Sequence, residues 1–187
     1  ILMITVLDIE TTMDFDNSTS SPYNGQQIVF VGYRSFMPDL SVVETHELFF
    51  YHNQCRTTPD AAKKLQDKLD ETTCLVGHNL KFDLQWLREC GFKYDGILWD
   101  TMIAEYLSHR GIKKSISLAE CAKRRSLPEK RTDLTDQYIK DKVSYEDMPP
   151  DIVREYCIAD VQTTTELAQA QLDELKMCWP TEESSFA

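Results

Sequence analysis

Apolar positions along the chain change from a continuous or alternating pattern to helical spacing, and this change separates the expected strands from the expected helices. The segment 4–10 is apolar and β-branched before it ends in acidic residues, which is typical of a buried strand. Segments 28–36 and 41–51 are also β-branched and aromatic, with a short turn between them, so the first three strands predict an antiparallel meander. Short apolar runs at 74–78 and 97–100 predict two more strands.

Helical spacing of apolar residues predicts five helices, and Ser117 and Asp151 stand where they would cap the last two. These helices are expected at 60–71, 79–87, 101–107, 117–125 and 151–175. The segments 13–27 and 126–150 are polar and lack periodicity, so we expect irregular loops there. The order of three strands, helix, strand, helix, strand and then helices predicts an α/β fold with a mixed five-stranded sheet flanked by helices.

The chain is long enough for one compact domain, since 42% of its 187 residues are hydrophobic. We expect this domain over 1–175 and a C-terminal linker or tail over 176–187, where Pro180 and polar residues interrupt the pattern. No apolar run approaches the length of a membrane span, and the N-terminal apolar segment lacks the basic residues of a signal peptide. A cytoplasmic protein with no membrane partner is therefore expected.

The net charge of -11 argues against wrapping a long nucleic-acid duplex, which needs many phosphate contacts from basic side chains. It does not exclude binding a few nucleotides through metal ions. Seven basic residues fall within the segment 113–131, and they form either a solvated helix face or a surface that holds a phosphate backbone. These residues are Lys113, Lys114, Lys123, Arg124, Arg125, Lys130 and Arg131.

Two carboxylates stand at the end of the first strand. Because side chains alternate across a strand, Asp8 and Glu10 project from the same face. Like charges this close raise each other's pKa unless a cation neutralises them. An isolated pair of this kind is more often a solvated acidic turn, so a metal site requires further ligands from elsewhere in the chain.

Three later residues could supply those ligands and a hydroxyl group. Asp83 lies one turn inside the helix that follows the fourth strand, where an acidic residue also commonly complements the helix dipole. Tyr156 and Asp160 are four residues apart, so they share one face of the last helix. Each feature alone is ordinary in a helix, and only their combination changes the interpretation.

Together these motifs resemble, in order and spacing, the three motifs of the DEDD exonuclease superfamily. The motifs are Asp8-x-Glu10, Asn79-x-x-x-Asp83 and Tyr156-x-x-x-Asp160. The tyrosine matches the DEDDy subgroup, because Glu155 stands where the DEDDh subgroup has a histidine. The sequence around Asp8, around Asp83 and at Trp99-Asp-Thr101 looks most like that of the 3′ to 5′ proofreading domain of a family A DNA polymerase from a bacteriophage. This resemblance implies an RNase H-like fold.

The resemblance implies a metal-dependent exonuclease that hydrolyses DNA from its 3′ end to nucleoside 5′-monophosphates by a two-metal mechanism. Oxygen ligands suit hard cations, so two Mg²⁺ or Mn²⁺ ions are the expected cofactors. The implied catalytic residues are Asp8, Glu10, Asp83, Tyr156 and Asp160, with the four carboxylates as metal ligands. Tyr156, whose ordinary pKa is near 10, is expected to orient the attacking water. The implied substrate-binding residues are Thr11, Asn79 and Phe82, of which Phe82 either stacks on a base or fills the core.

The implied partners are the 3′ end of single-stranded DNA and a polymerase domain in the same chain, although a free-standing enzyme fits the motifs as well. An RNase D-like exoribonuclease shares the same five residues, and comparing rates on matched DNA and RNA would separate the two. A noncatalytic nucleic-acid-binding module and an acidic metal-binding scaffold are further alternatives. The intact set of carboxylates argues against the binding module. We expect Asp100 and His78 to have structural roles.

Overall fold

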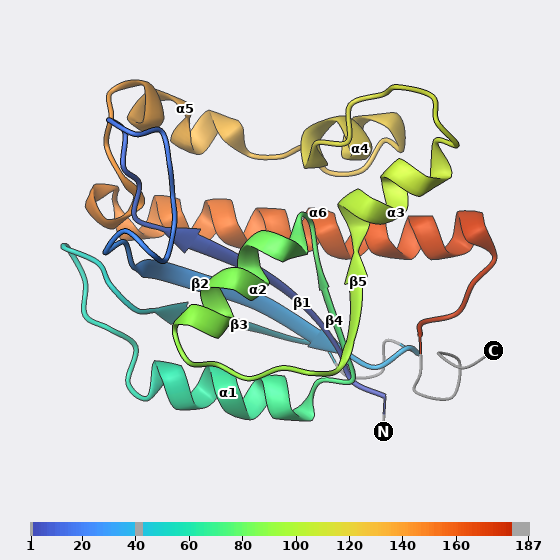
Figure 1. The fold of residues 1–187 in the computed structure, drawn as a ribbon, viewed down its shortest axis with the longest axis horizontal. Helices are drawn as coiled ribbons and strands as arrows, with labels where there is room; N and C mark the ends of the chain where they lie inside the picture. Colours follow the sequence, from blue (N-terminus) through green and yellow to red (C-terminus); the bar gives the residue numbers. More distant parts are fainter. Residues whose placement is uncertain (1, 40–42, 181–187) are drawn as a thin grey trace.

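A mixed five-stranded sheet forms the centre of the protein, as the pattern of strands predicts (Figure 1). The computed structural model describes residues 2–39 and 43–180. The strand order is β3-β2-β1-β4-β5. The strands β1 (Ile4–Thr11), β2 (Ile28–Phe36) and β3 (Val43–Phe49) form an antiparallel meander, and β4 (Cys74–Gly77) and β5 (Ile97–Asp100) run parallel to β1. The first two positions of the expected strand 41–51, 41 and 42, lie outside the described residues.

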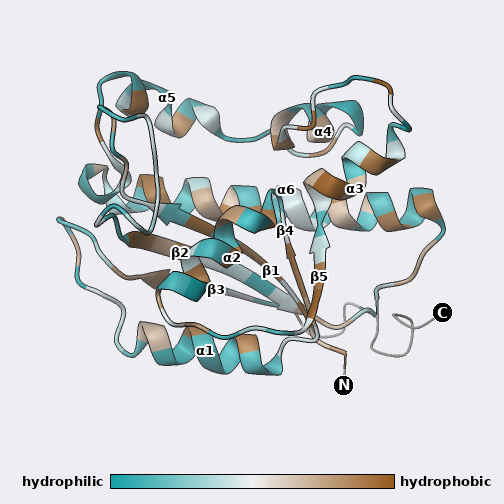
Figure 2. Ribbon diagram, in the orientation of Figure 1, coloured by the Kyte–Doolittle hydropathy of each residue, from teal (hydrophilic) through white to brown (hydrophobic). Residues whose placement is uncertain are grey.

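Helices cover both faces of the sheet. The helices α1 (Ala61–Glu71) and α2 (Leu80–Glu89) pack against one face, in a core cluster that includes Leu7 and Ile9 of β1. The long helix α6 (Pro150–Leu175) packs against the other face, in clusters that include Ile4 and Val6. Because apolar residues of β1 point to both sides, the strand is buried between two layers of helices. In Figure 2 the brown colour of hydrophobic residues follows much of the sheet, in keeping with this burial.

Smaller helices line the outer side of α6. The helices α3 (Thr101–Ser108), α4 (Leu118–Arg124) and α5 (Thr132–Lys140) all contact α6, and Figure 1 shows them along it. The Ser117 hydroxyl accepts a hydrogen bond from the Glu120 amide, which confirms the expected cap of α4. Within the described residues, no helix has an apolar stretch long enough to cross a bilayer.

The segment 126–150 differs from the prediction, because it contains α5 and a short 3₁₀ helix, η1 (Tyr145–Asp147). The expected loop was wrong because α5 has no recognisable start: Arg131 occupies its N-cap position and makes no side-chain cap hydrogen bond. The helix is held by tertiary packing instead, since Tyr138 and Ile139 pack against the cluster around Phe49.

The ends of α6 also differ in detail from the sequence analysis. Pro149, and not Asp151, stands at the N-cap, while Asp151 lies in the first turn. Beyond the expected domain boundary at 175, Trp179 is 6% exposed and its ring meets that of Phe36 edge-on at 5.5 Å. The chain therefore packs on the domain to at least Trp179, and positions 181–187 of the expected tail lie outside the described residues.

Candidate active site

The C-terminal half of β1 carries two carboxylates toward α6. Asp8 and Glu10 alternate with the inward-facing Leu7 and Ile9, so they lie on the same face of the sheet as Ile4 and Val6. Glu10 is only 7% exposed. The two acids therefore stand between the central strand and the longest helix, where water is largely excluded.

A third carboxylate can reach the site because β4 pairs with β1 only over Ile4–Val6 in the described structure. The chain then leaves the sheet and starts α2, whose first turn contains Asp83. This side chain is 3% exposed. Burial raises its pKa, and hydrogen bonding from the Ile9 backbone offsets part of that rise. Asp83 thus approaches the edge of β1 beside Asp8.

The start of α2 is fixed by Asp100. Its carboxylate accepts hydrogen bonds from the Asn79 amide at 3.1 Å and the Leu80 amide at 2.8 Å. The same side chain caps α3 by accepting from the Met102 amide. Asp100 therefore joins two helix starts, and its role is structural, as expected from the sequence.

The helix α6 brings Tyr156 and Asp160 under the carboxylates of β1. Tyr156 is 7% exposed and Asp160 is 4% exposed. Between them, Cys157 lies against Gly32, which pairs with Asp8 in the β1–β2 ladder. A Cβ atom on Gly32 would lie 2.9 Å from the Cys157 Sγ, so the missing side chain lets α6 approach the sheet at this point. The sequence does not predict this contact, because a single glycine in a strand gives no signal of its own.

Burial raises the pKa of all four carboxyl groups. The pKa of Glu10 is raised well above its usual range by burial and by the neighbouring Asp8 and Asp160. Burial and Asp8 do the same to Asp83. Burial and Asp8 raise the pKa of Asp160 to about 6 although Lys130 opposes the shift, and burial likewise raises the pKa of Asp8. The four negative charges are costly together, and a cation would relieve that cost.

Lys130 provides one such positive charge. It lies in the segment between α4 and α5, with its Nζ 2.5 Å from the Asp160 Oδ2 and 4.9 Å from the centre of the Tyr156 ring. The ring of Tyr145 from η1 stacks on the ring of Tyr156, with 6.0 Å between the ring centres. Burial, together with Glu10 and Asp160, raises the pKa of Tyr156 to about 12, so its hydroxyl stays protonated at neutral pH.

The oxygen atoms of this site fit a divalent cation. The ligand atoms of Asp8, Glu10 and Cys157 lie within 4.8 Å of one another. Asp83 Oδ1 and Asp160 Oδ1 are buried and have no hydrogen-bond partner among the described residues, a costly state that a metal ion would end. The Cys157 thiol donates toward the Asp8 carbonyl oxygen at 3.5 Å, and burial raises its pKa well above the usual range. It is therefore a neutral neighbour, and the carboxylates are the suitable ligands for Mg²⁺ or Mn²⁺.

The three expected substrate-binding residues lie at the start of α2 and the end of β1. Asn79 is exposed with a left-handed backbone (φ 63°), and its side chain makes no cap hydrogen bond. Phe82 packs against the core near Trp86 while remaining partly exposed. Thr11 is 4% exposed and its hydroxyl bonds to the Ser20 hydroxyl, so it is less available than expected. His78 bonds to the Thr101 hydroxyl through Nδ1 at 2.8 Å, in keeping with a structural role.

Most of the basic residues between 113 and 131 form ion pairs. Arg124 and Arg125 bind the buried Glu105 at 2.8 and 2.9 Å, and Arg131 binds Glu155 at 2.9 Å. Lys113, Lys114 and Lys123 are exposed and form no ion pair within the described part of the chain. The cluster is therefore mostly a structural device that ties α3, α4 and α6 together.

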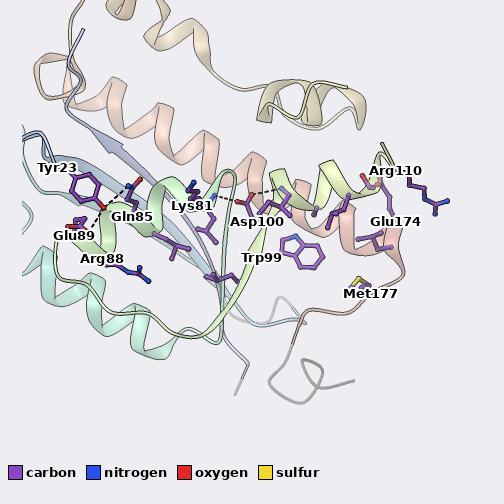
Figure 3. Close-up of a pocket in the computed structure, with 18 residues that line it drawn as sticks. Tyr23, Lys81, Gln85, Arg88, Glu89, Trp99, Asp100, Arg110, Glu174 and Met177 are labelled. Atoms are coloured by element: carbon purple, nitrogen blue, oxygen red, sulfur yellow. Dashed lines mark hydrogen bonds between the residues drawn. The ribbon is translucent and has the colours of Figure 1, made fainter. Parts of the chain in front are cut away.

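The structure also has a groove that is lined by other residues (Figure 3). Its volume is about 1020 Å³, and it runs between α2, β5, α3 and the end of α6. Trp99 and the exposed apolar residues Leu98, Ile103 and Leu107 line it. None of the four clustered carboxylates contributes to its lining, so it is distinct from the candidate active site.

Sequence comparison identifies the family. Residues 41–176 match the family model described as 3′-5′ exonuclease. The chain belongs to this 3′-5′ exonuclease family. The matched region contains Asp83, Tyr156 and Asp160, while Asp8 and Glu10 precede it. No curated protein matches the exonuclease sequence.

Solved structures share the fold of this exonuclease at low sequence identity. The apo form of a nuclease has a TM-score of 0.60 and 18% identity, over 92% of this chain and 73% of that one. Brucella melitensis NrnC with bound Mg²⁺ has a TM-score of 0.57 and 18% identity over the same shares. The POL domain of Pol1 from M. smegmatis, in complex with DNA primer-template and dNTP, has a TM-score of 0.52 and 16% identity over 94% of this chain and 24% of that one. These likenesses support an RNase H-like exonuclease fold.

Proposed function

We propose that this chain is a metal-dependent 3′ to 5′ exonuclease of the DEDDy type that removes nucleotides one at a time from the 3′ end of DNA. The observation that carries the proposal is the convergence of four carboxyl groups from three separate elements, with Asp8 partly buried and the other three buried. Asp8 and Glu10 come from β1, Asp83 from α2 and Asp160 from α6, with the Tyr156 hydroxyl beside them. A noncatalytic module would have no need of four mutually repelling acids.

The residues of the site divide the work by position. Asp8 acts on each of the other acids, since its charge raises the pKa of Glu10, Asp83 and Asp160. It is therefore the suitable ligand to be shared between two metal sites. When bound, divalent cations neutralise these acids, hold the scissile phosphate and acidify a water molecule. Tyr156 keeps its proton at neutral pH in the metal-free protein, and its hydroxyl would orient the attacking water by hydrogen bonding.

The neighbours of the site suit a 3′-terminal nucleotide. Asn79 presents an exposed side-chain amide, which makes no cap hydrogen bond, at the start of α2, and Phe82 presents a partly exposed ring one turn later. Stacking on an aromatic ring is tolerant of base identity, which suits an enzyme that removes any nucleotide. Thr11 would contribute through its backbone, because its hydroxyl is bonded to Ser20.

A proofreading role on DNA is part of this proposal. It is supported by the sequence of the motifs and by the structural likeness to Pol1, whose structure holds a DNA primer-template. The partners would then be the 3′ end of single-stranded DNA and a polymerase domain in the same chain, as in a bacteriophage family A polymerase. The reaction would take place in the cytoplasm. The net charge of -11 agrees with a domain to which a partner delivers the strand.

The test is digestion of 5′-labelled single-stranded DNA and RNA of the same sequence, each with Mg²⁺, Mn²⁺ or EDTA. We expect a ladder that shortens from the 3′ end of DNA, requires the metal and releases nucleoside 5′-monophosphates. Faster digestion of RNA would replace DNA by RNA as the substrate class. A folded protein that cleaves neither strand under any condition would overturn the proposal.

The matched variants are Asp8→Asn and Asp136→Asn. The first removes a charge from the centre of the site without changing the shape of the side chain, and we expect it to abolish cleavage. The second removes the same charge from an exposed position on α5, and we expect unchanged cleavage. Substantial activity in Asp8→Asn would show that the metal ligands are wrongly assigned.

A further inference from the structure

Lys130 is the member of the basic run that pairs with one of the clustered acids, and it is more buried than its neighbour in the chain. Its side chain is 24% exposed, whereas that of the next residue, Arg131, is 42% exposed. Its ammonium group reaches Asp160 Oδ2 on α6 and lies over the ring of Tyr156. The other oxygen of Asp160 is buried without a partner among the described residues.

The segment that carries Lys130 is attached to α6 on both sides of this residue. Thr163 of α6 donates a hydrogen bond to the Pro128 carbonyl oxygen at 3.3 Å, and Leu127 packs with Leu167. On the other side, Arg131 pairs with Glu155 of α6. The fold therefore delivers Lys130 to Asp160, and the contact is more than a chance pairing of two surface side chains.

An ammonium group and a divalent cation cannot both approach the same carboxylate closely without strong repulsion, because they carry like charges in a poorly solvated place. Asp160 supplies one carboxylate, and Lys130 already occupies one of its oxygens. Any divalent cation that binds there must either displace the ammonium group or bind against its positive charge.

We propose that Lys130 is the internal cation of the metal-free site, that it leaves Asp160 when a divalent cation binds, and that this exchange sets the metal affinity. The inference rests on the proposed function, since Asp160 serves as a metal ligand in both. It adds a residue that the exonuclease motifs do not contain. It also joins metal occupancy to the position of the segment between α4 and α5.

The first test compares Mn²⁺ binding by isothermal titration calorimetry in the wild type, Lys130→Met and Arg131→Met. Methionine keeps the unbranched shape of the lysine side chain, one heavy atom shorter, and removes its charge. We expect Lys130→Met to bind Mn²⁺ about tenfold more tightly, which corresponds to about 1.4 kcal/mol. Arg131→Met removes a charge one residue away, and we expect less than a twofold change. Unchanged or weaker binding in Lys130→Met would overturn the proposal.

A second comparison separates the pairing from general charge. In the Asp160→Asn background Lys130 has lost its partner, so the Lys130→Met substitution should no longer tighten Mn²⁺ binding. A tenfold effect that persists in this background would mean that Lys130 acts only through the net charge of the site, and the exchange would be rejected.

A third test measures the reactivity of the lysine amine directly, in the wild-type protein. Acetic anhydride labelling followed by peptide mass spectrometry measures each lysine, and the exposed Lys113 serves as the internal reference. We expect labelling of Lys130 to rise several-fold when Mn²⁺ is added, while labelling of Lys113 stays constant. Constant or reduced labelling of Lys130 would contradict its departure from Asp160.

These measurements do not require hydrolysis. A protein that shows the exchange but cleaves no nucleic acid would retain the Lys130 inference and reject the proposed function. A protein that cleaves DNA with Mn²⁺ while Lys130 stays unreactive would do the opposite. Failure of the wild type and of Lys130→Met to bind Mn²⁺ would overturn both.

Discussion

Gly32 lies opposite Asp8 in the β1–β2 ladder, and the space that its side chain would fill is taken by Cys157 of α6. A strand glycine at such a position marks a close approach of another element. Here the close approach brings the helix that carries Tyr156 and Asp160 to the strand that carries Asp8. The distance between these two parts of the candidate active site thus depends on the absence of a side chain at position 32.

A methyl group at position 32 should separate those halves. In Gly32→Ala the new Cβ would lie 2.9 Å from Cys157 Sγ and 3.0 Å from Ile158 Cδ1, so α6 must move outward. We expect about 1–3 kcal/mol of lost stability, the usual cost of overpacking, and a loss of exonuclease rate larger than that stability loss explains. Urea denaturation and a single-turnover assay measure the two effects.

The control for this variant is Gly32→Ala combined with Cys157→Ala, which removes the Sγ that the new methyl group meets. We expect part of the rate to return. A double variant no better than Gly32→Ala would show that the lost rate does not come from the position of α6.

The pH dependence of the metal-free protein should reverse the usual preference for neutral pH. Burial raises the pKa of Asp8, Glu10, Asp83 and Asp160 above the values of an unfolded chain. Between the unfolded and folded pKa values, the unfolded state has lost its protons while the folded state retains them, so stability falls as pH rises. For Asp160 this window runs from 3.8 to about 6. In EDTA we therefore expect a higher melting temperature at pH 5 than at pH 7.

Addition of Mg²⁺ should remove this difference, because the cation favours the ionised acids. Differential scanning calorimetry at both pH values, with Mg²⁺ or EDTA, is the measurement. A metal-free melting temperature that is equal or higher at pH 7 would mean that the acids are not coupled as the structure places them.

Glu105 illustrates a buried charge with a structural purpose. It is 1% exposed and binds Arg124, Arg125 and Gln171. Burial opposes its ionisation, but the hydrogen bonds from Arg125 and Arg124 prevail and lower its pKa to about 2. The acid therefore remains charged throughout the pH range of the previous prediction.

Glu105→Ala should cost about 3–5 kcal/mol, because it leaves two arginines without their buried partner. Glu174→Ala removes an exposed carboxylate from the same Arg125 and should cost at most about 1 kcal/mol. Urea denaturation measures both changes in the free energy of unfolding. Similar losses in the two variants would show that burial at Glu105 adds nothing to the ion pairs.

The sequence predicts the strands, the sheet and the carboxylate positions because these depend on local periodicity and on spacing within one element. Asp8 and Glu10 share a face because strands alternate, and Tyr156 and Asp160 share a face because they are four apart on a helix. The partners between elements escape such reasoning. Lys130 belongs to a basic run whose members go to different acids, and only the path of the chain from α4 to α5 decides which one it meets.

The missed helix α5 has the same cause. Its sequence offers no cap and few apolar residues, so its local preference for helix is weak. Contacts of Tyr138 and Ile139 with residues distant in the chain stabilise it. Tertiary packing of this kind cannot be deduced from spacing within the segment itself.

Removal of the Tyr156 hydroxyl tests its role in orienting water. Tyr156→Phe keeps the ring that stacks with Tyr145 and lies beneath Lys130. We expect kcat to fall roughly 10- to 100-fold, with Mn²⁺ affinity unchanged, because orientation of the nucleophile is lost while the carboxylates remain. Tyr106→Phe removes the same hydroxyl from a side chain that is 64% exposed on α3, and its rate should equal that of the wild type. A Tyr156→Phe rate within twofold of the wild type would remove the hydroxyl from the mechanism, whereas a loss of Mn²⁺ binding would reassign it to the support of the metal ligands.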